Sequence, residues 1–238
     1  MVSPRMPPHK GSGQGRRGLT VRVRRARRRK PSSTEWLTRQ LNDPYVAEAQ
    51  RLGFRSRAAF KLLQLDERFH LLAPGRRVLD LGCAPGGWTQ VAVARTGADK
   101  GQGVVVGVDL KPTDPLPGAR IMQGDFREPG TETAIRAALG GNADIVLSDM
   151  AAPATGHAAT DHLRIIALAE DAFAFAETVL ALGGTFVAKV FQGGTEGELL
   201  ALLKQAFVEV RHAKPAASRA ESAETYVVAK GFRARSSL

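Results

Sequence analysis

Four aspartates and one lysine each stand at or near the end of a hydrophobic segment. They are Asp80, Asp109, Asp125, Asp149 and Lys189. In an open parallel sheet, ligands bind beyond the carboxyl ends of the strands, near the point where the strand order reverses. A single aspartate in such a position is at least as often a helix cap, but the five residues together indicate a binding or catalytic site. Lys189 lies inside an otherwise apolar segment, and burying its charge without a partner would be costly.

The glycine-rich turn after the first of these segments indicates which class of cofactor could bind. A dinucleotide-binding turn has the pattern Gly-x-Gly-x-x-Gly, which lets the backbone approach a pyrophosphate at a helix N-terminus. This chain has Gly82-x-Ala84-x-x-Gly87 instead, and Pro85 lacks a backbone N–H donor. The turn therefore disfavours a phosphate cradle, and with it a nicotinamide-dependent oxidoreductase.

A ligand with an adenosine part and a zwitterionic amino-acid part fits these residues better. The backbone of Gly86 and Gly87 can contact the amino-acid part. Asp109 can accept from both ribose hydroxyls, and Asp125 can accept from the adenine amino group. The glycine turn and the two aspartates together favour S-adenosylmethionine as the cofactor.

The segments that carry these residues alternate between strand-like and helix-like patterns. We expect strands at 77–81, 103–109, 119–125, 143–149, 185–191, 208–212 and 225–229. We expect helices at 33–41, 45–50, 56–69, 88–95, 130–139, 161–182 and 195–206.

This alternation predicts an α/β protein with a Rossmann-like, mostly parallel seven-stranded sheet and helices on both faces. No helix is expected between the last two strands, so these strands can be antiparallel neighbours. An antiparallel last strand distinguishes an S-adenosylmethionine-dependent methyltransferase fold from a plain dinucleotide-binding fold.

Positive charge is concentrated at the start of the chain. The 238 residues are 43% hydrophobic and carry a formal net charge of +11. Residues 1–30 contain eleven Lys and Arg and no acidic residue, so the whole excess lies there. We predict a basic disordered arm at 1–32, which is either a solvated tail or an RNA-contacting arm. The rest, 33–238, should be a single domain with a helical, RNA-facing segment at 33–76 and a cofactor-binding, catalytic sheet at 77–232.

Composition excludes several other classes of protein. The one cysteine, Cys83, cannot form an internal disulfide, and the five histidines lack the spacing of a zinc site. No apolar run approaches the roughly 20 residues that span a bilayer, and the N-terminus lacks the apolar core of a signal peptide. We therefore expect a cytoplasmic protein that binds no metal and no membrane, with nucleic acid as its polyanionic partner.

Six short blocks occur in a fixed order along the chain. They are SRAAFKL (56–62), DLGCAPGGW (80–88), QGDF (123–126), SDMA (148–151), VAKVF (187–191), and SRA with ETY (218–220 and 224–226). In order and spacing these blocks resemble the FtsJ/RrmJ-type ribosomal RNA 2′-O-methyltransferases. The resemblance covers about residues 33–232, which is nearly all of the chain except the basic arm.

The resemblance implies a catalytic tetrad and a set of cofactor contacts. The tetrad is Lys61, Asp149, Lys189 and Glu224, and the cofactor contacts are Gly86, Trp88, Asp109, Asp125 and Asp149. Methyl transfer from a sulfonium to a hydroxyl requires removal of the hydroxyl proton, because a neutral hydroxyl is a poor nucleophile. Burial and a second ammonium nearby favour the neutral form of a lysine, whereas carboxylates oppose it. We expect Lys189 to accept the proton and Lys61 to position the 2′-oxygen, while the two carboxylates orient these groups.

The resemblance also implies a substrate. Its bacterial members methylate the ribose of a uridine in the A-loop of 23S rRNA of the large (50S) ribosomal subunit, leaving S-adenosyl-L-homocysteine. We expect the same reaction here, carried out by a monomer. In the loop after Asp149 the chain has Ala152-Pro153, where the family more often has Pro-Asn, so a polar side chain near the target nucleotide is missing.

Two alternatives remain open from the sequence. The tetrad indicates the chemistry and not the RNA, so a tRNA or an mRNA cap could be the substrate. A non-catalytic RNA-binding relative is disfavoured because all four tetrad residue types are present.

Overall fold

The computed structural model describes residues 38, 41–153, 155–192 and 197–233. The predicted arm at 1–32 lies outside these residues, as does nearly all of the predicted helix at 33–41, so both remain predictions. Tyr45–Leu238 form one compact unit, which contains the sheet. Of the other unit, Met1–Pro44, only Thr38 and residues 41–44 are described, and there the Asn42 amide donates to the Thr38 carbonyl at 2.7 Å.

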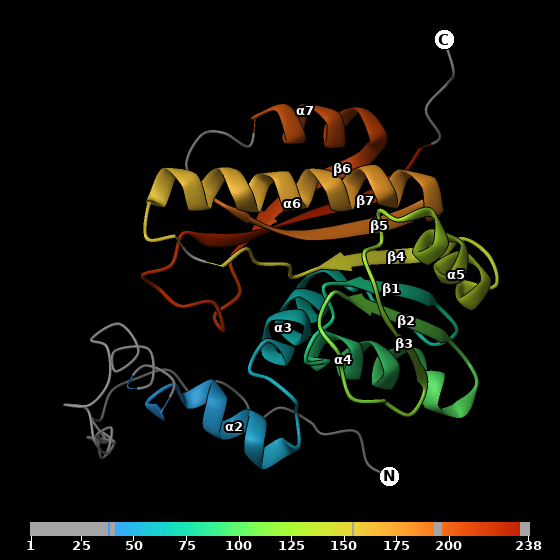
Figure 1. Ribbon diagram of the computed structural model, residues 1–238, viewed down its shortest axis with the longest axis horizontal. Coiled ribbons are helices and arrows are strands. Elements are labelled where there is room, and N and C mark those ends of the chain that lie inside the picture. Colours follow the sequence, from blue (N-terminus) through green and yellow to red (C-terminus); the bar gives the residue numbers. More distant parts are fainter. Residues whose placement is uncertain (1–37, 39–40, 154, 193–196, 234–238) are drawn as a thin grey trace. The chain divides into compact units, whose positions relative to one another are not determined.

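Seven strands form one sheet in the order β3-β2-β1-β4-β5-β7-β6 (Figure 1). The strands are β1 (Arg77–Leu81), β2 (Val104–Asp109), β3 (Ala119–Gln123), β4 (Ala143–Ser148), β5 (Leu180–Phe191), β6 (Phe207–Ala213) and β7 (Glu224–Phe232). Neighbours among β1 to β5 are parallel, whereas β7 lies between β5 and β6 and is antiparallel to both. The predicted fold class is confirmed, including the antiparallel last strand.

Helices cover both faces of this sheet (Figure 1). The helices are α2 (Pro44–Leu52), α3 (Ala59–Phe69), α4 (Gly87–Thr96), α5 (Pro129–Leu139), α6 (Ala158–Val179) and α7 (Gly197–Ala206). α3 and α4 pack with Val78 on one face, and α5, α6 and α7 pack with Leu79 on the other. Consecutive strand residues point to opposite faces and both are fully buried, which is why the strands read as continuous apolar runs.

The boundary between α6 and β5 differs from the prediction. The sequence predicts a helix over 161–182, but α6 ends at Val179 and β5 begins at Leu180. Leu180 has extended backbone, is buried and pairs with Ala143 of β4. Gly183, with a φ of +78°, therefore lies in an irregular strand end rather than at a helix end. Residues 180–182 are apolar like the helix before them, so their pattern does not mark the change.

Within the described residues, no helix is long and apolar enough to cross a membrane. The same residues contain no cluster of three or more His, Cys, Asp or Glu side chains that could hold a metal ion.

Candidate active site

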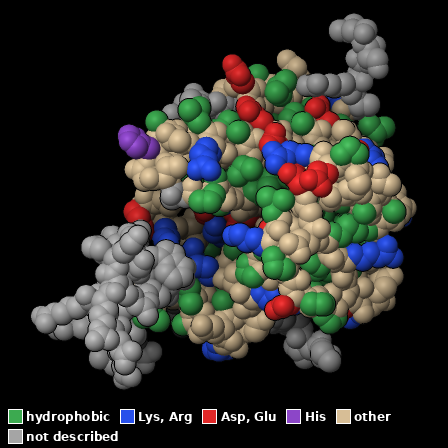
Figure 2. All heavy atoms as spheres, viewed as in Figure 1, with side chains coloured by type: hydrophobic (Ala, Val, Ile, Leu, Met, Phe, Trp, Pro, Cys, Tyr) green, Lys and Arg blue, Asp and Glu red, His purple; other side chains and the backbone are tan. Residues whose placement is uncertain are grey.

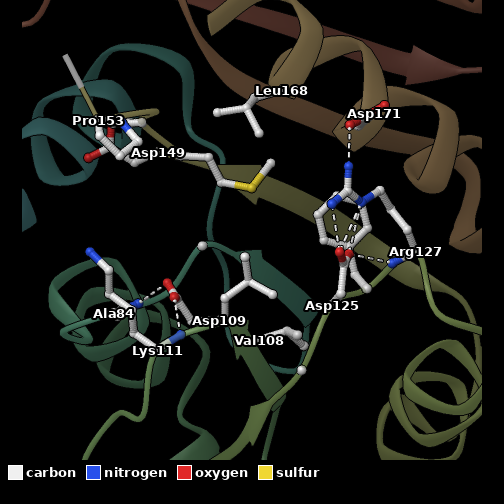
Figure 3. A pocket seen from close by; sticks show the side chains of 16 residues that line it. Ala84, Val108, Asp109, Lys111, Asp125, Arg127, Asp149, Pro153, Leu168 and Asp171 are labelled. Atoms are coloured by element: carbon white, nitrogen blue, oxygen red, sulfur yellow. Dashed lines mark hydrogen bonds and ion pairs between the residues drawn. The ribbon is translucent and has the colours of Figure 1, made fainter. Parts of the chain in front are cut away.

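A cavity of about 410 Å³ lies at the carboxyl ends of the central strands (Figure 3). Its walls come from the end of β2, the loops that follow β1 to β4, and α6. β1 and β4 are neighbours where the strand order reverses, which is the usual ligand position in such a sheet. Three of the predicted strand-end aspartates line this cavity, namely Asp109, Asp125 and Asp149.

The turn between β1 and α4 forms one wall, and its path requires glycine. Gly82 has a φ of +76°, and a Cβ at this position would lie 2.3 Å from Cγ of Met150. The N–H groups of Gly82 and Cys83 both donate to the carbonyl of Val108, at 2.8 and 3.1 Å, which ties the turn to β2. Gly86, a predicted cofactor contact, caps α4 with a φ of +106° and follows the cavity-lining Ala84 by two residues.

Asp109 stands at the end of β2 with its carboxylate held by two backbone groups. Oδ2 accepts the N–H of Ala84 at 2.9 Å, and Oδ1 accepts the N–H of Lys111 at 2.8 Å (Figure 3). Each oxygen thus keeps a lone pair for a ligand. The carboxylate can accept from two neighbouring hydroxyl groups without losing either bond.

Asp125, just after β3, is paired with a residue that the sequence analysis did not include. Its carboxylate accepts from the backbone N–H and from the guanidinium of Arg127, with N···O distances between 2.6 and 3.1 Å. The Arg127 guanidinium holds the pKa of this carboxyl below its usual range. The only sequence signal for Arg127 was a basic residue two positions after a candidate aspartate.

The four predicted tetrad residues form one cluster that α3, the end of β4, β5 and the start of β7 bring together. Lys61 Nζ lies 2.8 Å from Glu224 Oε1 and 3.6 Å from Asp149 Oδ2. Lys189 Nζ lies 3.2 Å from Asp149 Oδ1 and donates to the Asp149 carbonyl at 2.9 Å. The two lysine side chains are only 7% and 6% exposed, so both charges are buried and paired.

Two hydroxyl groups complete the hydrogen bonding of this cluster. Tyr226 donates its phenol proton to Asp149 Oδ1 at 2.7 Å, and Ser218 donates to Glu224 Oε1 at 2.7 Å. The sequence analysis gave neither residue a catalytic or cofactor-binding role. The available signal for Tyr226 was its spacing of two from Glu224, because residues i and i+2 of a strand share a face.

The electrostatics of the cluster keep Asp149 ionised and Tyr226 neutral. Burial raises the pKa of Asp149, but the ammonium groups of Lys189 and Lys61 and the bond from Tyr226 outweigh burial, so this pKa lies below its usual value. Burial and the neighbouring carboxylates of Asp149 and Glu224 raise the pKa of Tyr226 well above its usual value. Asp149 is therefore a hydrogen-bond acceptor only, and the Tyr226 phenol remains a donor.

Asp80 and Cys83 lie close to the cavity but not on its surface. Asp80 is 1% exposed and accepts a bond from the Thr89 hydroxyl at 2.6 Å. Burial, together with the charges of Asp149 and Asp109, raises the pKa of Asp80 to about 7. Burial also raises the pKa of the Cys83 thiol to about 12, which fits a small packed residue rather than a nucleophile.

Trp88 is 3% exposed and does not line the cavity. Its indole N–H donates to the carbonyl of Ala58 at 2.8 Å, and its ring packs 5.6 Å from that of Tyr226. These contacts make Trp88 part of the core between α4 and the start of α3. Its predicted contact with a cofactor stays a prediction.

Comparisons with known proteins show which family this chain resembles. Residues 54–232 match the model of the FtsJ-like methyltransferases. A protein of Paramagnetospirillum magneticum named ribosomal RNA large subunit methyltransferase E is 66% identical over 228 residues, covering 95% of this chain and 93% of that protein. A protein of the same name from Parvibaculum lavamentivorans is 59% identical over 234 residues, covering 95% and 92%. A crystal structure described as a ribosomal RNA methyltransferase of Plasmodium falciparum is 33% identical, covers 75% of this chain and 98% of that one, and has a TM-score of 0.66.

Proposed function

The chain belongs to the FtsJ-like methyltransferase family, and from this we propose that it methylates a ribose 2′-hydroxyl of ribosomal RNA, using S-adenosylmethionine. One observation carries the proposal. Two buried lysines contact the same carboxylate, that of Asp149, and Asp149 is also one of the residues that line the cavity at the strand ends. Such a cluster can take a proton from a hydroxyl and hold the resulting oxygen beside a cofactor.

The cavity suits the proposed cofactor in size and in chemistry. Its volume of about 410 Å³ lies within the usual range for small-molecule sites. Asp109 would accept from the ribose hydroxyls and Asp125 from the adenine amino group, while the backbone at Gly86 would contact the amino-acid part. Trp88 would support this turn from its buried side, away from the cavity. When bound, S-adenosylmethionine supplies an electrophilic methyl group on a sulfonium.

In the proposed mechanism, Lys189 is the proton acceptor. Its Nζ has two acceptors on Asp149, the carbonyl oxygen at 2.9 Å and Oδ1 at 3.2 Å. To act as a base, the Lys189 ammonium must first release a proton to solvent. The resulting neutral amine can donate its two N–H groups to these oxygens and keep its lone pair for the substrate hydroxyl. Asp149 therefore orients the base.

Lys61 would position the 2′-oxygen. Its ammonium is held by Glu224, with Nζ 2.8 and 2.9 Å from the two carboxylate oxygens, and more loosely by Asp149 at 3.6 Å. Glu224 takes two of its three N–H groups, and the third, whose contact with Asp149 is longer than a hydrogen bond, can turn to a ligand. A cation at this point stabilises negative charge that develops on the attacking oxygen.

The relatives support ribosomal RNA of the large subunit as the substrate, because their names describe that reaction. The finer proposal is a uridine in the A-loop of 23S rRNA. Figure 2 shows Lys and Arg side chains gathered beside a hollow in the surface, with acidic side chains visible inside it. Such a rim would attract an RNA backbone while the interior accepts a cationic cofactor.

The experiment is a methylation assay on purified large ribosomal subunits that lack the modification. We expect transfer of labelled methyl from S-adenosylmethionine to one 23S rRNA uridine, mapped by mass spectrometry of nuclease fragments as a ribose modification. Methylation of tRNA or capped mRNA instead would refute the substrate and leave the chemistry intact. Cofactor binding without transfer to any of these RNAs would favour a non-catalytic relative.

A further inference from the structure

Arg127 connects two carboxylates on the wall of the cavity (Figure 3). Its Nη2 lies 2.6 Å from Asp125 Oδ2, and its Nη1 lies 3.1 Å from Asp171 Oδ2. Asp125 follows β3, whereas Asp171 belongs to α6, so the guanidinium joins two separate elements. All three side chains line the cavity.

The bonds from Arg127 nearly saturate the carboxylate of Asp125. Oδ1 accepts the backbone N–H at 3.0 Å and Nε–H at 2.9 Å, while Oδ2 accepts Nη2–H at 2.6 Å and a longer branch from Nε at 3.1 Å. A carboxylate offers about four lone-pair positions, and three N–H groups occupy three of them. The one acceptor position that remains is on Oδ2.

The ion pair with Asp171 contributes little to stability. The side chain of Arg127 is 56% exposed and that of Asp171 is 41% exposed, and solvent screens the attraction within exposed pairs of this kind. Its effect is geometric instead, because Asp171 holds the guanidinium from the side opposite Asp125. The guanidinium cannot rotate away from Asp125 without losing that bond.

We propose that Arg127, braced by Asp171, is a positioning residue that fixes Asp125 with a single acceptor facing the bound base, and so selects a purine with an amino group at position 6. This inference rests on the proposed function, in which Asp125 meets the adenine of the cofactor. A 6-amino group donates to the open position on Oδ2. A 6-oxo group places a lone pair against a lone pair, and a buried polar group without a partner is penalised.

Because the Asp125 carboxyl stays ionised, it cannot adapt to a 6-oxo base by donating a proton. Without the Arg127 side chain the carboxylate can rotate and has two further acceptor positions that water can fill, because only the backbone N–H of residue 127 still donates to it. The difference in affinity between the two kinds of base should then shrink, even if both still bind.

The test measures dissociation constants for S-adenosylhomocysteine and for its deaminated analogue, S-inosylhomocysteine, by calorimetry. We expect the wild-type protein to prefer the adenosine compound. Arg127→Lys keeps the positive charge but loses the paired Nε–H and Nη2–H bonds to Asp125. In this variant the preference should fall by about tenfold or more. In Asp171→Asn, which weakens the brace from an ion pair to at most a neutral hydrogen bond, the preference should fall by roughly two- to fivefold.

The matched control is Arg136→Lys, which breaks the comparable exposed fork between Arg136 and Glu132 on α5. Its preference should equal that of the wild type. An unchanged preference in both Arg127→Lys and Asp171→Asn overturns the inference while leaving the proposed function standing. Failure of the wild-type protein to bind S-adenosylhomocysteine overturns the proposed function itself. Asp171→Asn alters only an exposed side chain, so it keeps the test decisive if Arg127→Lys fails to fold.

Discussion

The carboxylate of Asp149 is the point at which three buried polar side chains meet. Its Oδ1 contacts the ammonium of Lys189 and the phenol of Tyr226, at 3.2 and 2.7 Å, and its Oδ2 faces Lys61 at 3.6 Å. Glu224 takes the closer contact with Lys61, so two carboxylates balance two ammonium groups. Buried charges arranged in this way are costly to leave unpaired, and removing one member changes the surroundings of all the others.

At the scale of single residues, the first prediction concerns Lys189. Lys189→Met fills a similar volume but cannot accept a proton, so single-turnover methylation of large subunits should fall by about 10²- to 10⁴-fold. Lys230→Met is the control, because Lys230 also donates to a backbone carbonyl, that of Phe69 at 2.9 Å, but lies outside the cluster. Near-normal turnover in Lys189→Met would falsify the proposed role of Lys189.

The second prediction concerns Asp80 and pH. In the folded protein the pKa of Asp80 is about 7, whereas an unfolded aspartate titrates near its usual value of about 3.9. Between these values the folded state binds more protons than the unfolded state, so this group lowers the free energy of unfolding as pH rises from about 4 to about 7. Below that window both states are protonated, and above it the full penalty, about 4 kcal/mol at most, is present.

Asp80→Asn removes this titration and keeps an oxygen that can accept from Thr89. The free energy of unfolding of the variant minus that of the wild type should increase between pH 4 and pH 7 and then stay level. Urea denaturation at four pH values across this window measures the difference. A difference that does not change with pH would contradict the burial argument.

At the scale of elements, the position of β7 assembles the cluster. β7 enters the sheet antiparallel beside β5, and this register sets Tyr226 opposite Lys189 and Glu224 opposite Phe191. α3 packs on the same face as Tyr226, which brings Lys61 to Glu224. A parallel last strand would reverse the order of Glu224 and Tyr226 along β5. The antiparallel strand is therefore needed for the site as well as for the fold.

The sequence predicted the helices and strands well where the hydrophobic periodicity and the turn or cap residues at its ends indicate the same element. The run at 103–109, which is apolar up to its terminal aspartate, matches β2 closely, and three of the four strand-end aspartates line one cavity. The predicted end of α6 was wrong because the apolar residues 180–182 suit the end of a buried helix as well as the start of a buried strand. Arg127 was missed as a member of the site, and the bond from Tyr226 to Asp149 was not predicted, because both depend on contacts between distant parts of the chain. A guanidinium bridging Asp125 to α6 leaves no local pattern.

The third prediction tests the turn between β1 and α4. Gly82→Ala forces a side chain into a left-handed backbone position and places its Cβ against Met150, so we expect a lower melting temperature and weaker binding of S-adenosylhomocysteine. Gly101→Ala is the matched control, because Gly101 has a similar φ of +72° but nothing within 4 Å of the added Cβ. It should lose stability, by about 1 kcal/mol, without losing affinity. Equal affinity losses in both variants would mean that the contact with Met150 is unimportant.

At the scale of the whole molecule, two sets of positive charge are to be distinguished. Two cations within the Tyr45–Leu238 unit, Arg55 and Lys214, are held in place by hydrogen bonds, and residues 1–30 carry a second set. Arg55 donates to the carbonyls of Asp114 and Pro115 at 2.7 and 2.6 Å, and Lys214 donates to those of Ala220 and Ser222 at 3.0 and 2.6 Å. These bonds neutralise no charge, since the acceptors are backbone groups. Both cations therefore remain available to an RNA phosphate while they hold loops of the unit in place.

The last prediction concerns residues 1–30, which hold eleven Lys and Arg and lie outside the described part of the chain. If about five of them contact phosphates, deleting the segment should flatten the plot of log affinity against log salt by roughly 3.5 to 4.5 units. Affinity for large subunits should then be lost mainly at moderate salt, while the single-turnover rate at saturating protein stays unchanged. A variant with the same eleven residues replaced by Gln separates charge from chain length, and it should behave like the deletion. A slope that both variants leave intact would mean that the segment does not contact RNA, and a lost single-turnover rate would instead give it a part in the chemical step.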